Sequence, residues 1–178
     1  MPQMTTVSDR VLRTLRAIPD YPKPGILFQD ITPVLADGEL LREVVADMCR
    51  PFGDAGVTQV LGIEARGFIL ASPVAYHFGA GFVPVRKAGK LPWDSESASY
   101  ELEYGQETLE IHKDALAPGE RVLIVDDVLA TGGTAAATAS LVERLGAKVM
   151  GIACLIELGA LHGRDKLKGH DFFSLIAY

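Results

Sequence analysis

One stretch constrains the fold of this chain more than any other: residues 122–134, which read VLIVDDVLATGGT. It begins with an apolar, largely β-branched run, passes through Asp126 and Asp127, and ends in two threonines around a glycine pair. A continuous apolar run is typical of a parallel strand that is buried on both faces. Because a helical pattern follows at once, the stretch predicts a strand, a tight loop and a helix N-terminus.

The loop of this stretch has the composition of an anion-binding site. Gly132 and Gly133 allow the backbone to turn and to approach an anion without an intervening Cβ atom. Thr131 and Thr134 add hydroxyl donors. The helix that follows directs its free N–H groups and the positive end of its dipole to the same place. We therefore expect a phosphate group to bind there.

The paired carboxylates of Asp126 and Asp127 indicate which ligands, besides a phosphate, this site could bind. Carboxylate oxygens accept hydrogen bonds from sugar hydroxyls and bind hydrated divalent cations. The alternative is an ordinary strand exit that ends in a Gly-Gly turn. The pairing of the acids and the position of the loop directly after a strand favour a ligand site. No lysine follows the glycines, which argues against a P-loop nucleotidase.

Composition excludes several classes of protein. The 178 residues suffice for one domain with a sizeable core, and we find no repeat and no second domain boundary. No apolar run approaches the roughly 18 residues of a membrane span, and the N-terminus lacks the order of a signal peptide. The net charge of −6 argues against coating of nucleic acid, which requires a concentrated basic face. We expect a cytoplasmic protein in which Cys49 and Cys154 are core residues, and the histidines lack metal-ligand spacing.

Two further strand exits carry cations. The first follows an expected strand at 57–63 and places Arg66 at the start of a helix. The second follows the next expected strand and brings Arg86, Lys87 and Lys90 within five positions. Each group could be a merely solvated surface. In an acidic chain, at the carboxyl ends of strands, a site for a polyanion is the better interpretation.

Alternating strands and helices predict an α/β fold with a mostly parallel sheet, whose ligands bind at the carboxyl ends of the strands. The polar run at 93–99 predicts a long loop, carried by a hairpin formed from residues 100–105 and 108–114. Beyond these we expect helices at about 7–18, 39–52, 68–78, 134–145 and 161–167, and strands at 57–63, 81–86, 148–158 and 172–178 as well as the one that begins at residue 122.

The stretch 122–134 resembles the phosphoribosyl-diphosphate signature of the type I phosphoribosyltransferases. The match extends from about residue 19 to the C-terminus. It implies a single domain, residues 1–178, with a mostly parallel central sheet flanked by helices. It also implies a small N-terminal helix and base-binding hood at about 1–35, and a flexible catalytic loop and hairpin at about 88–107. Four further stretches are similar to the adenine phosphoribosyltransferases of this family: 28–33 (FQDITP), 64–68 (EARGF), 86–92 (RKAGKLP) and 100–105 (YELEYG).

The resemblance implies a reaction of purine salvage. Such enzymes transfer the phosphoribosyl group of 5-phosphoribosyl 1-diphosphate to adenine and give AMP and diphosphate. Positive charge grows on the ribose, as in an oxocarbenium ion, so catalysis needs preorganised stabilisation of charge rather than a protein nucleophile. Mg²⁺ is the implied cofactor, held largely by substrate oxygens and water, with Asp126 and Asp127 as further candidate ligands. The resemblance also implies a cytoplasmic homodimer that binds neither nucleic acid nor membrane.

Roles of single residues follow from the same resemblance. By pattern alone the apolar strip at 26–28 is a lid or an edge strand, and by resemblance it is the hood over the base. The peptide between Glu64 and Ala65 is expected to be strained. Glu103 would stabilise the cationic ribose or accept a proton from the base, and the two roles cannot be separated from sequence. The expected catalytic residues are Glu103, Tyr104 and Arg66. The expected substrate-binding residues are Leu27, Phe28, Gln29 and Leu158 at the base, Asp126 and Asp127 at the ribose, Ala130, Thr131, Gly132, Gly133 and Thr134 at the terminal phosphate, and Ala65, Arg86, Lys87 and Lys90 at the diphosphate.

Two alternatives remain at this point. A regulator that senses phosphoribosyl diphosphate usually carries a separate DNA-binding domain, and the roughly 20 residues before the hood are too few for one. A sister transferase would use hypoxanthine, guanine, xanthine or a pyrimidine, whereas the hood and the signature stretches favour adenine. A purely structural protein would not need three anion loops at one edge of a sheet.

Overall fold

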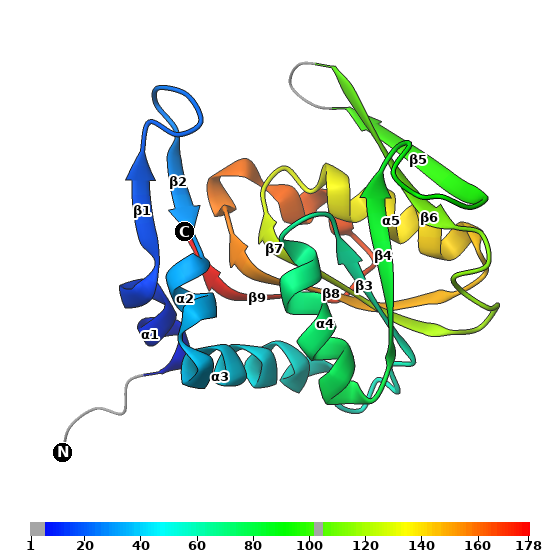
Figure 1. Ribbon diagram of the computed structural model, residues 1–178, viewed down its shortest axis with the longest axis horizontal. Coiled ribbons are helices and arrows are strands. Elements are labelled where there is room, and N and C mark those ends of the chain that lie inside the picture. The colour runs from blue at the N-terminus through cyan, green and yellow to red at the C-terminus, as the bar shows by residue number, and fades with distance from the viewer. Residues whose placement is uncertain (1–5, 102–104) are drawn as a thin grey trace.

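Seven strands form one sheet in the part of the chain that the computed structural model describes, residues 6–101 and 105–178 (Figure 1). Its strands are β3 (Gln59–Ile63), β4 (Gly81–Lys87), β5 (Ser95–Glu101), β6 (Gln106–His112), β7 (Arg121–Leu129), β8 (Lys148–Glu157) and β9 (Phe172–Ala177). They lie in the order β5-β6-β4-β3-β7-β8-β9. β3, β4, β7, β8 and β9 pair in parallel, and at one edge β6 pairs antiparallel with both β4 and β5. The predicted α/β fold with a mostly parallel sheet is confirmed.

Helices cover both faces of this sheet, as the sequence of β7 requires. Neighbouring residues of a strand point to opposite faces, and both faces of β7 carry apolar side chains. The helices are α3 (Gly38–Cys49), α4 (Gly67–Phe78) and α5 (Gly133–Arg144). Leu123 and Val125 are buried in a hydrophobic cluster with residues of α3 and α4. Val122 and Ile124 are buried in a second cluster with residues of α5.

A smaller N-terminal unit stands beside the main sheet (Figure 1). It consists of α1 (Val7–Thr14), β1 (Arg16–Pro19), β2 (Leu27–Asp30) and α2 (Thr32–Ala36). The expected first helix, at about 7–18, is wrong after Thr14. The residues from Arg16 to Pro19 instead pair with β2 in an antiparallel hairpin. The hydrogen bonds of that pairing outweigh the helical spacing of the apolar residues.

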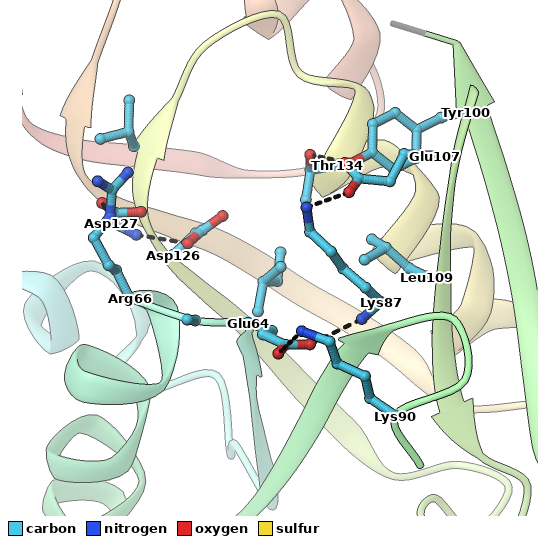
Figure 2. A pocket seen from close by; sticks show the side chains of 13 residues that line it. Glu64, Arg66, Lys87, Lys90, Tyr100, Glu107, Leu109, Asp126, Asp127 and Thr134 are labelled. Carbon is cyan, nitrogen blue, oxygen red and sulfur yellow. Dashed lines mark hydrogen bonds and ion pairs between the residues drawn. The ribbon is translucent and has the colours of Figure 1, made fainter. Parts of the chain in front are cut away.

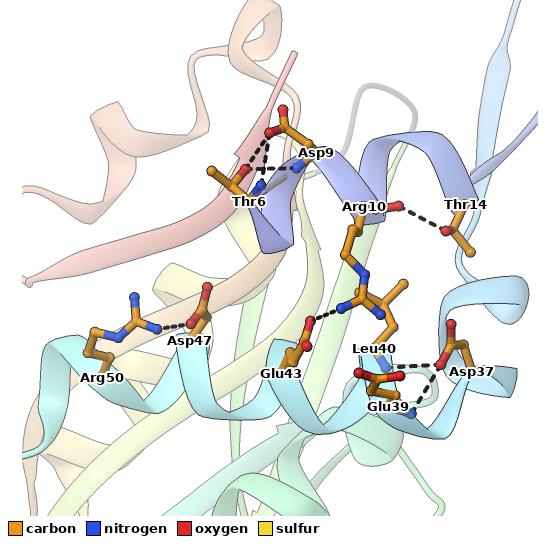
Figure 3. Close-up of polar contacts among 10 residues, drawn as sticks. All are labelled: Thr6, Asp9, Arg10, Thr14, Asp37, Glu39, Leu40, Glu43, Asp47 and Arg50. Atoms are coloured by element: carbon orange, nitrogen blue, oxygen red, sulfur yellow. Dashed lines mark hydrogen bonds and ion pairs between the residues drawn. The ribbon is translucent and has the colours of Figure 1, made fainter. Parts of the chain in front are cut away.

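Polar side chains fix the N-terminal unit to the helix layer (Figure 3). Thr6 and Asp9 form a capping box at the start of α1, with both backbone-to-side-chain distances at 3.1 Å. Asp37 caps α3 by accepting two backbone N–H groups of its first turn at 3.0 Å. Arg10 Nη1 lies 2.5 Å from Glu43 Oε2 and joins the two helices. Well-defined helix ends therefore set the position of the chain that leads into β2.

The outer hairpin differs from the prediction. We expected a loop at 93–99, but β5 begins at Ser95 and pairs with β6 from Ser95 opposite His112 to Glu101 opposite Gln106. Its first five residues read SESAS, and among them only Ala98 is buried, so no apolar alternation marks the strand. Hydrogen bonds to β6 supply the missing stabilisation. Trp93, the only tryptophan of the chain, precedes β5 and is 68% exposed.

The remaining elements agree with the expected ones to within a few residues. The short helix expected at 161–167 is a 3-10 helix, Gly163–Leu167, preceded by a 3-10 turn at Gly159–Leu161. A further 3-10 turn, Arg50–Phe52, extends α3. Across the described ranges, no helix combines the length and the apolar character that a membrane crossing needs.

Candidate active site at the carboxyl edge of the sheet

The carboxyl ends of β3, β4 and β7 meet at one edge of the sheet, because these neighbouring strands run parallel. A cavity of about 560 Å³ opens there. Figure 2 shows charged side chains from several elements converging on it. Of the residues predicted from sequence, those that line it are Ala65, Arg66, Lys87, Lys90, Asp126, Asp127 and Thr134.

The paired aspartates lie inside β7 rather than after it, since the strand continues to Leu129. Asp126 Oδ1 accepts a hydrogen bond from the backbone N–H of Asp127 at 2.8 Å. Arg66 Nε lies 2.6 Å from Asp127 Oδ2 and forms an ion pair with it. Removal from water raises the pKa of Asp126 well above its ordinary value, and the charge of Asp127 adds to the rise. Two carboxylates so close together favour a cation or sugar hydroxyls between them.

The predicted phosphate loop encloses a smaller hollow of about 60 Å³ after β7. Gly132 has a φ angle of +79°, in the left-handed region that favours glycine. A Cβ atom on Gly132 would lie 2.3 Å from the backbone oxygen of Gly163, so no other residue fits without displacement. Because α5 begins at Gly133, the free N–H groups of its first turn lie at this loop. The predicted loop residues that line the hollow are Ala130, Thr131, Gly132 and Thr134.

Glu64 organises the predicted cations. Its carboxylate accepts hydrogen bonds from Arg86 Nη2 at 3.1 Å and Lys90 Nζ at 2.6 Å. It also accepts the backbone N–H of Lys87 at 3.0 Å. Burial raises the pKa of Glu64, but these donors outweigh that effect and hold the pKa at about 2. The carboxylate is therefore charged, and Arg86 turns toward it and toward the backbone oxygen of Lys90, which is 3.1 Å away. The peptide bond between Glu64 and Ala65, for which the sequence predicted strain, is cis rather than trans.

A second polar network was not expected from the sequence. Lys87 Nζ forms an ion pair with Glu107. Glu107 Oε2 accepts a hydrogen bond from the hydroxyl of Tyr100 at 2.7 Å, and Thr134 Oγ1 donates to the same hydroxyl at 2.9 Å. Burial, together with the charge of Glu107, raises the pKa of Tyr100 to about 12, although the bond from Thr134 opposes this. The network joins the outer hairpin to the phosphate loop.

The hood forms a pocket of its own. Its volume is about 240 Å³, and most of its lining is apolar. The guanidinium carbon of Arg66 lies 5.2 Å from the centroid of the Phe28 ring, within the range of a cation–π contact. The edge of the Tyr21 ring meets Phe28 with the ring centroids 5.1 Å apart. The residues that line the pocket are Ile26, Leu27, Phe28, Gln29, Arg66, Val128, Ala130, Ile156 and Leu158.

Two predicted catalytic residues, Glu103 and Tyr104, lie outside the described residues, so their roles stay predictions. Within 6–101 and 105–178, no group of three or more His, Cys, Asp or Glu side chains is arranged to hold a metal ion. Of the residues described, four carboxylates line the cavity: Glu64 and Glu107 are paired with the cations of β4 and its exit, and Asp126 and Asp127 lie side by side on β7.

Comparison with known proteins places this site in a family. Residues 39–176 match the model of the phosphoribosyl transferase domain. The adenine phosphoribosyltransferase of Symbiobacterium thermophilum is 55% identical over 164 residues, which make up 92% of this chain and 96% of that protein. The chain belongs to the adenine phosphoribosyltransferase family. The resemblance stated from the sequence is confirmed.

Solved structures of adenine phosphoribosyltransferases share the whole fold. The crystal structure from Rhodothermus marinus matches with a TM-score of 0.94 and 50% identity, and the match covers 98% of this chain and 100% of that one. The Saccharomyces cerevisiae enzyme was solved with adenine and an imino-altritol bisphosphate. It matches with a TM-score of 0.91 and 38% identity and covers 97% of this chain and 100% of its own.

Sequence reasoning missed three side chains that shape this site: Glu64, Tyr100 and Glu107. Glu64 and Tyr100 belong to the stretches EARGF and YELEYG, which resemble the family, but neither side chain had a predicted role in the site. Glu107 had no such signal. It reaches the cavity because β6 pairs with β5 in a register that sets Glu107 opposite Tyr100.

Proposed function

We propose that this protein transfers the phosphoribosyl group of 5-phosphoribosyl 1-diphosphate to adenine, with AMP and diphosphate as products. The observation that carries this function is the continuity of the three hollows. Arg66 and Val128 line both the large cavity and the hood pocket, and Ala130 lines both the hood pocket and the hollow at the phosphate loop. A base, a ribose and a phosphate joined in one molecule need such an arrangement.

The hood pocket fits the base. Phe28 offers an aromatic face, Leu158 lines the same pocket directly after β8, and the backbone around Leu27 and Gln29 would pair with the donor and acceptor edge of a purine. The yeast relative was solved with adenine, and that of Giardia lamblia with 9-deazaadenine. These ligands support adenine as the base for this chain.

The phosphate loop and the aspartates would hold the phosphoribosyl group. The loop from Ala130 to Thr134 binds the terminal phosphate through backbone N–H groups and threonine hydroxyls. Asp126 and Asp127 accept hydrogen bonds from the ribose hydroxyls. Because both groups are set by β7 and the start of α5, they are positioned before substrate binds, and little reorganisation is needed.

The diphosphate would lie in the large cavity among cations. Lys87 and Lys90 line this cavity, and Arg66 lies at its border with the hood pocket. Their charges stabilise the negative charge that grows on the leaving group, while the backbone of Ala65 adds a donor beside it. Arg86 acts on this group through Glu64, to which it donates at 3.1 Å. Glu103 and Tyr104 keep the roles that the resemblance assigns to them.

Mg²⁺ fits the residues present. Burial and the charge of Asp127 raise the pKa of Asp126, so a divalent cation near the pair would relieve their repulsion. Asp126 and Asp127 would hold it together with substrate oxygens and water. When bound, the ion supplies charge neutralisation at the diphosphate. We also propose a cytoplasmic homodimer of single-domain chains with a flexible catalytic loop at about 88–107, by analogy with the family.

AMP formation from adenine, phosphoribosyl diphosphate and Mg²⁺ tests the function, with hypoxanthine and guanine in parallel. Of the three bases, we expect only adenine to be turned over. We expect the turnover number to fall about a hundred-fold in Asp126→Asn and in Asp127→Asn. Turnover with an oxopurine would overturn the base assignment, and turnover retained in both variants would overturn the ribose site. Arg50→Lys, which changes an exposed ion pair with Asp47 far from the cavity, is the control.

A further inference from the structure

The large cavity contains a carboxylate that the proposed reaction does not use. Glu107 lies on β6 and lines the same cavity as Lys87 and Lys90. Its side chain is 23% exposed and faces the space that a diphosphate would enter. A carboxylate in a pocket lined by cations needs an explanation, because its negative charge would repel a bound diphosphate.

Two contacts hold Glu107 in place, and one of its partners is fixed in turn (Figure 2). It forms the ion pair with Lys87 and accepts the Tyr100 hydroxyl at 2.7 Å. Tyr100 itself is fixed by the hydroxyl of Thr134 at 2.9 Å. Its ring packs on the phosphate loop so closely that a Cβ atom on Gly133 would lie 2.7 Å from Tyr100 Cδ2. The carboxylate is thus anchored at the cavity wall.

The pairing with Glu107 also means that Lys87 has a charged partner inside the protein. The hydrogen bond and the charge of Lys87 lower the pKa of Glu107, so its carboxylate is ionised at neutral pH. Lys87 therefore already has an anionic partner within the protein. A diphosphate that binds beside Lys87 must share it with Glu107 or displace Glu107 from it. In both cases a negative charge remains next to the bound anion.

We propose that Glu107 competes with diphosphate for Lys87, and that it thereby weakens binding of this product and speeds its release. The proposal rests on the proposed function, since it names the anion that the cavity accepts. Glu107 acts on the ligand directly through charge and indirectly through Lys87. It is a determinant of product affinity rather than a group that takes part in bond cleavage.

Glu107→Gln tests the proposal, because the amide keeps the shape and can still accept the Tyr100 hydroxyl. The matched control is Glu101→Gln, which removes the same charge from an exposed position of the same hairpin. Isothermal titration calorimetry with magnesium diphosphate at low ionic strength gives the dissociation constant for each protein. We expect Glu107→Gln to bind about five-fold more tightly than the wild type, and Glu101→Gln to bind like the wild type. The difference should shrink as salt is added.

The sign of the effect separates this role from a structural one. If Glu107 only oriented Lys87 for the ligand, its neutralisation would weaken diphosphate binding. Weaker or unchanged binding in Glu107→Gln therefore overturns the proposal and leaves the proposed function intact. A wild-type protein that binds no magnesium diphosphate overturns the proposed function, and this proposal with it. Stopped-flow dissociation gives a second readout, with a slower release of diphosphate expected from Glu107→Gln.

Discussion

Glu64 shows how strongly one residue of this site depends on its neighbours. Its side chain is 9% exposed and accepts hydrogen bonds from two cationic side chains and one backbone N–H group. These donors lower its pKa from the ordinary value of 4.5 to about 2 in spite of its burial. The unfolded chain therefore takes up a proton at Glu64 at a higher pH than the folded protein does.

Glu64 should consequently contribute to acid sensitivity. Its contribution to stability is complete above pH 4.5 and is lost as the pH falls toward 2, through the pKa of the folded state. Water in the open cavity screens the interaction, so we expect Glu64 to account for about 1 kcal/mol of the stability lost on acidification. Urea unfolding of Glu64→Gln between pH 5 and pH 3, followed by circular dichroism, should show a shallower pH dependence than the wild type. An unchanged slope would contradict this, and Glu101→Gln serves as the control.

Single residues differ in how far their roles could be predicted. Asp126 lies within the strand that Thr131 and Gly132 directly follow, so their common location needed only local reasoning. The meeting of Glu64 with Lys90 depends on the parallel pairing of β3 with β4, and that of Glu107 with Lys87 on the pairing of β4 with β6. The sequence contains no local pattern that specifies these registers.

At the scale of elements, the 3-10 helix Gly163–Leu167 packs against the backbone of the phosphate loop and supports it. A Cβ atom on Gly163 would lie 2.3 Å from the backbone oxygen of Ala130, so the two backbones are in close contact. Arg164 holds this helix to the end of β8 by donating to both carboxylate oxygens of Glu157, at 2.5 and 2.6 Å. Its guanidinium also lies 4.6 Å from the centroid of the Phe172 ring. The helix thus links β8 and β9 to the loop.

Arg164→Ala should loosen this support. We expect the KM for phosphoribosyl diphosphate to rise about ten-fold, because the buried carboxylate of Glu157 loses its cationic partner, while the KM for adenine changes less than three-fold. Initial rates with each substrate varied in turn provide the measurement. Arg144→Ala is the control, since Arg144 pairs with Glu96 at the far end of α5. Equal rises in both KM values would show that the helix does not act on the phosphate loop specifically.

Elements were predictable where burial determined them. The apolar runs of β7 and β8 and the Ala-rich α5 follow from hydrophobic pattern alone. β1 and β5 cannot be predicted from hydrophobic pattern, because their side chains are mostly exposed or half-buried. Their stability comes from pairing with the neighbouring strand. Such edge strands are specified by pairing, which a single sequence does not display.

At the scale of the whole molecule, the site lies between two units that the core joins. The sheet carries the phosphate loop and the cations, and the N-terminal hairpin carries the hood. Val11 of α1 is fully buried in the same hydrophobic cluster as residues of α3 and β9. Ser8 Oγ adds a hydrogen bond of 3.0 Å to the backbone oxygen of Leu175. The packing of α1 therefore determines where the hood meets the sheet.

Val11→Ala should reveal this coupling. The cavity left in the core should lower the free energy of unfolding by about 2 kcal/mol. Because α1 leads directly into β1, the KM for adenine should rise more than that for phosphoribosyl diphosphate. The neighbouring Leu12 is 44% exposed, and Leu12→Ala should change stability by less than about 0.5 kcal/mol. Urea unfolding by circular dichroism and initial rates test both effects, and equal stability of the two variants would contradict the role of Val11.

The position of Trp93 has a consequence for spectroscopy. As the only tryptophan, and one that is largely exposed beside the outer hairpin, it is the single strong emitter of the chain. Its fluorescence in the folded protein should already resemble that of an indole in water. Emission will therefore report poorly on the melting of the core, but it will be a local and sensitive signal for ligands that alter the hairpin.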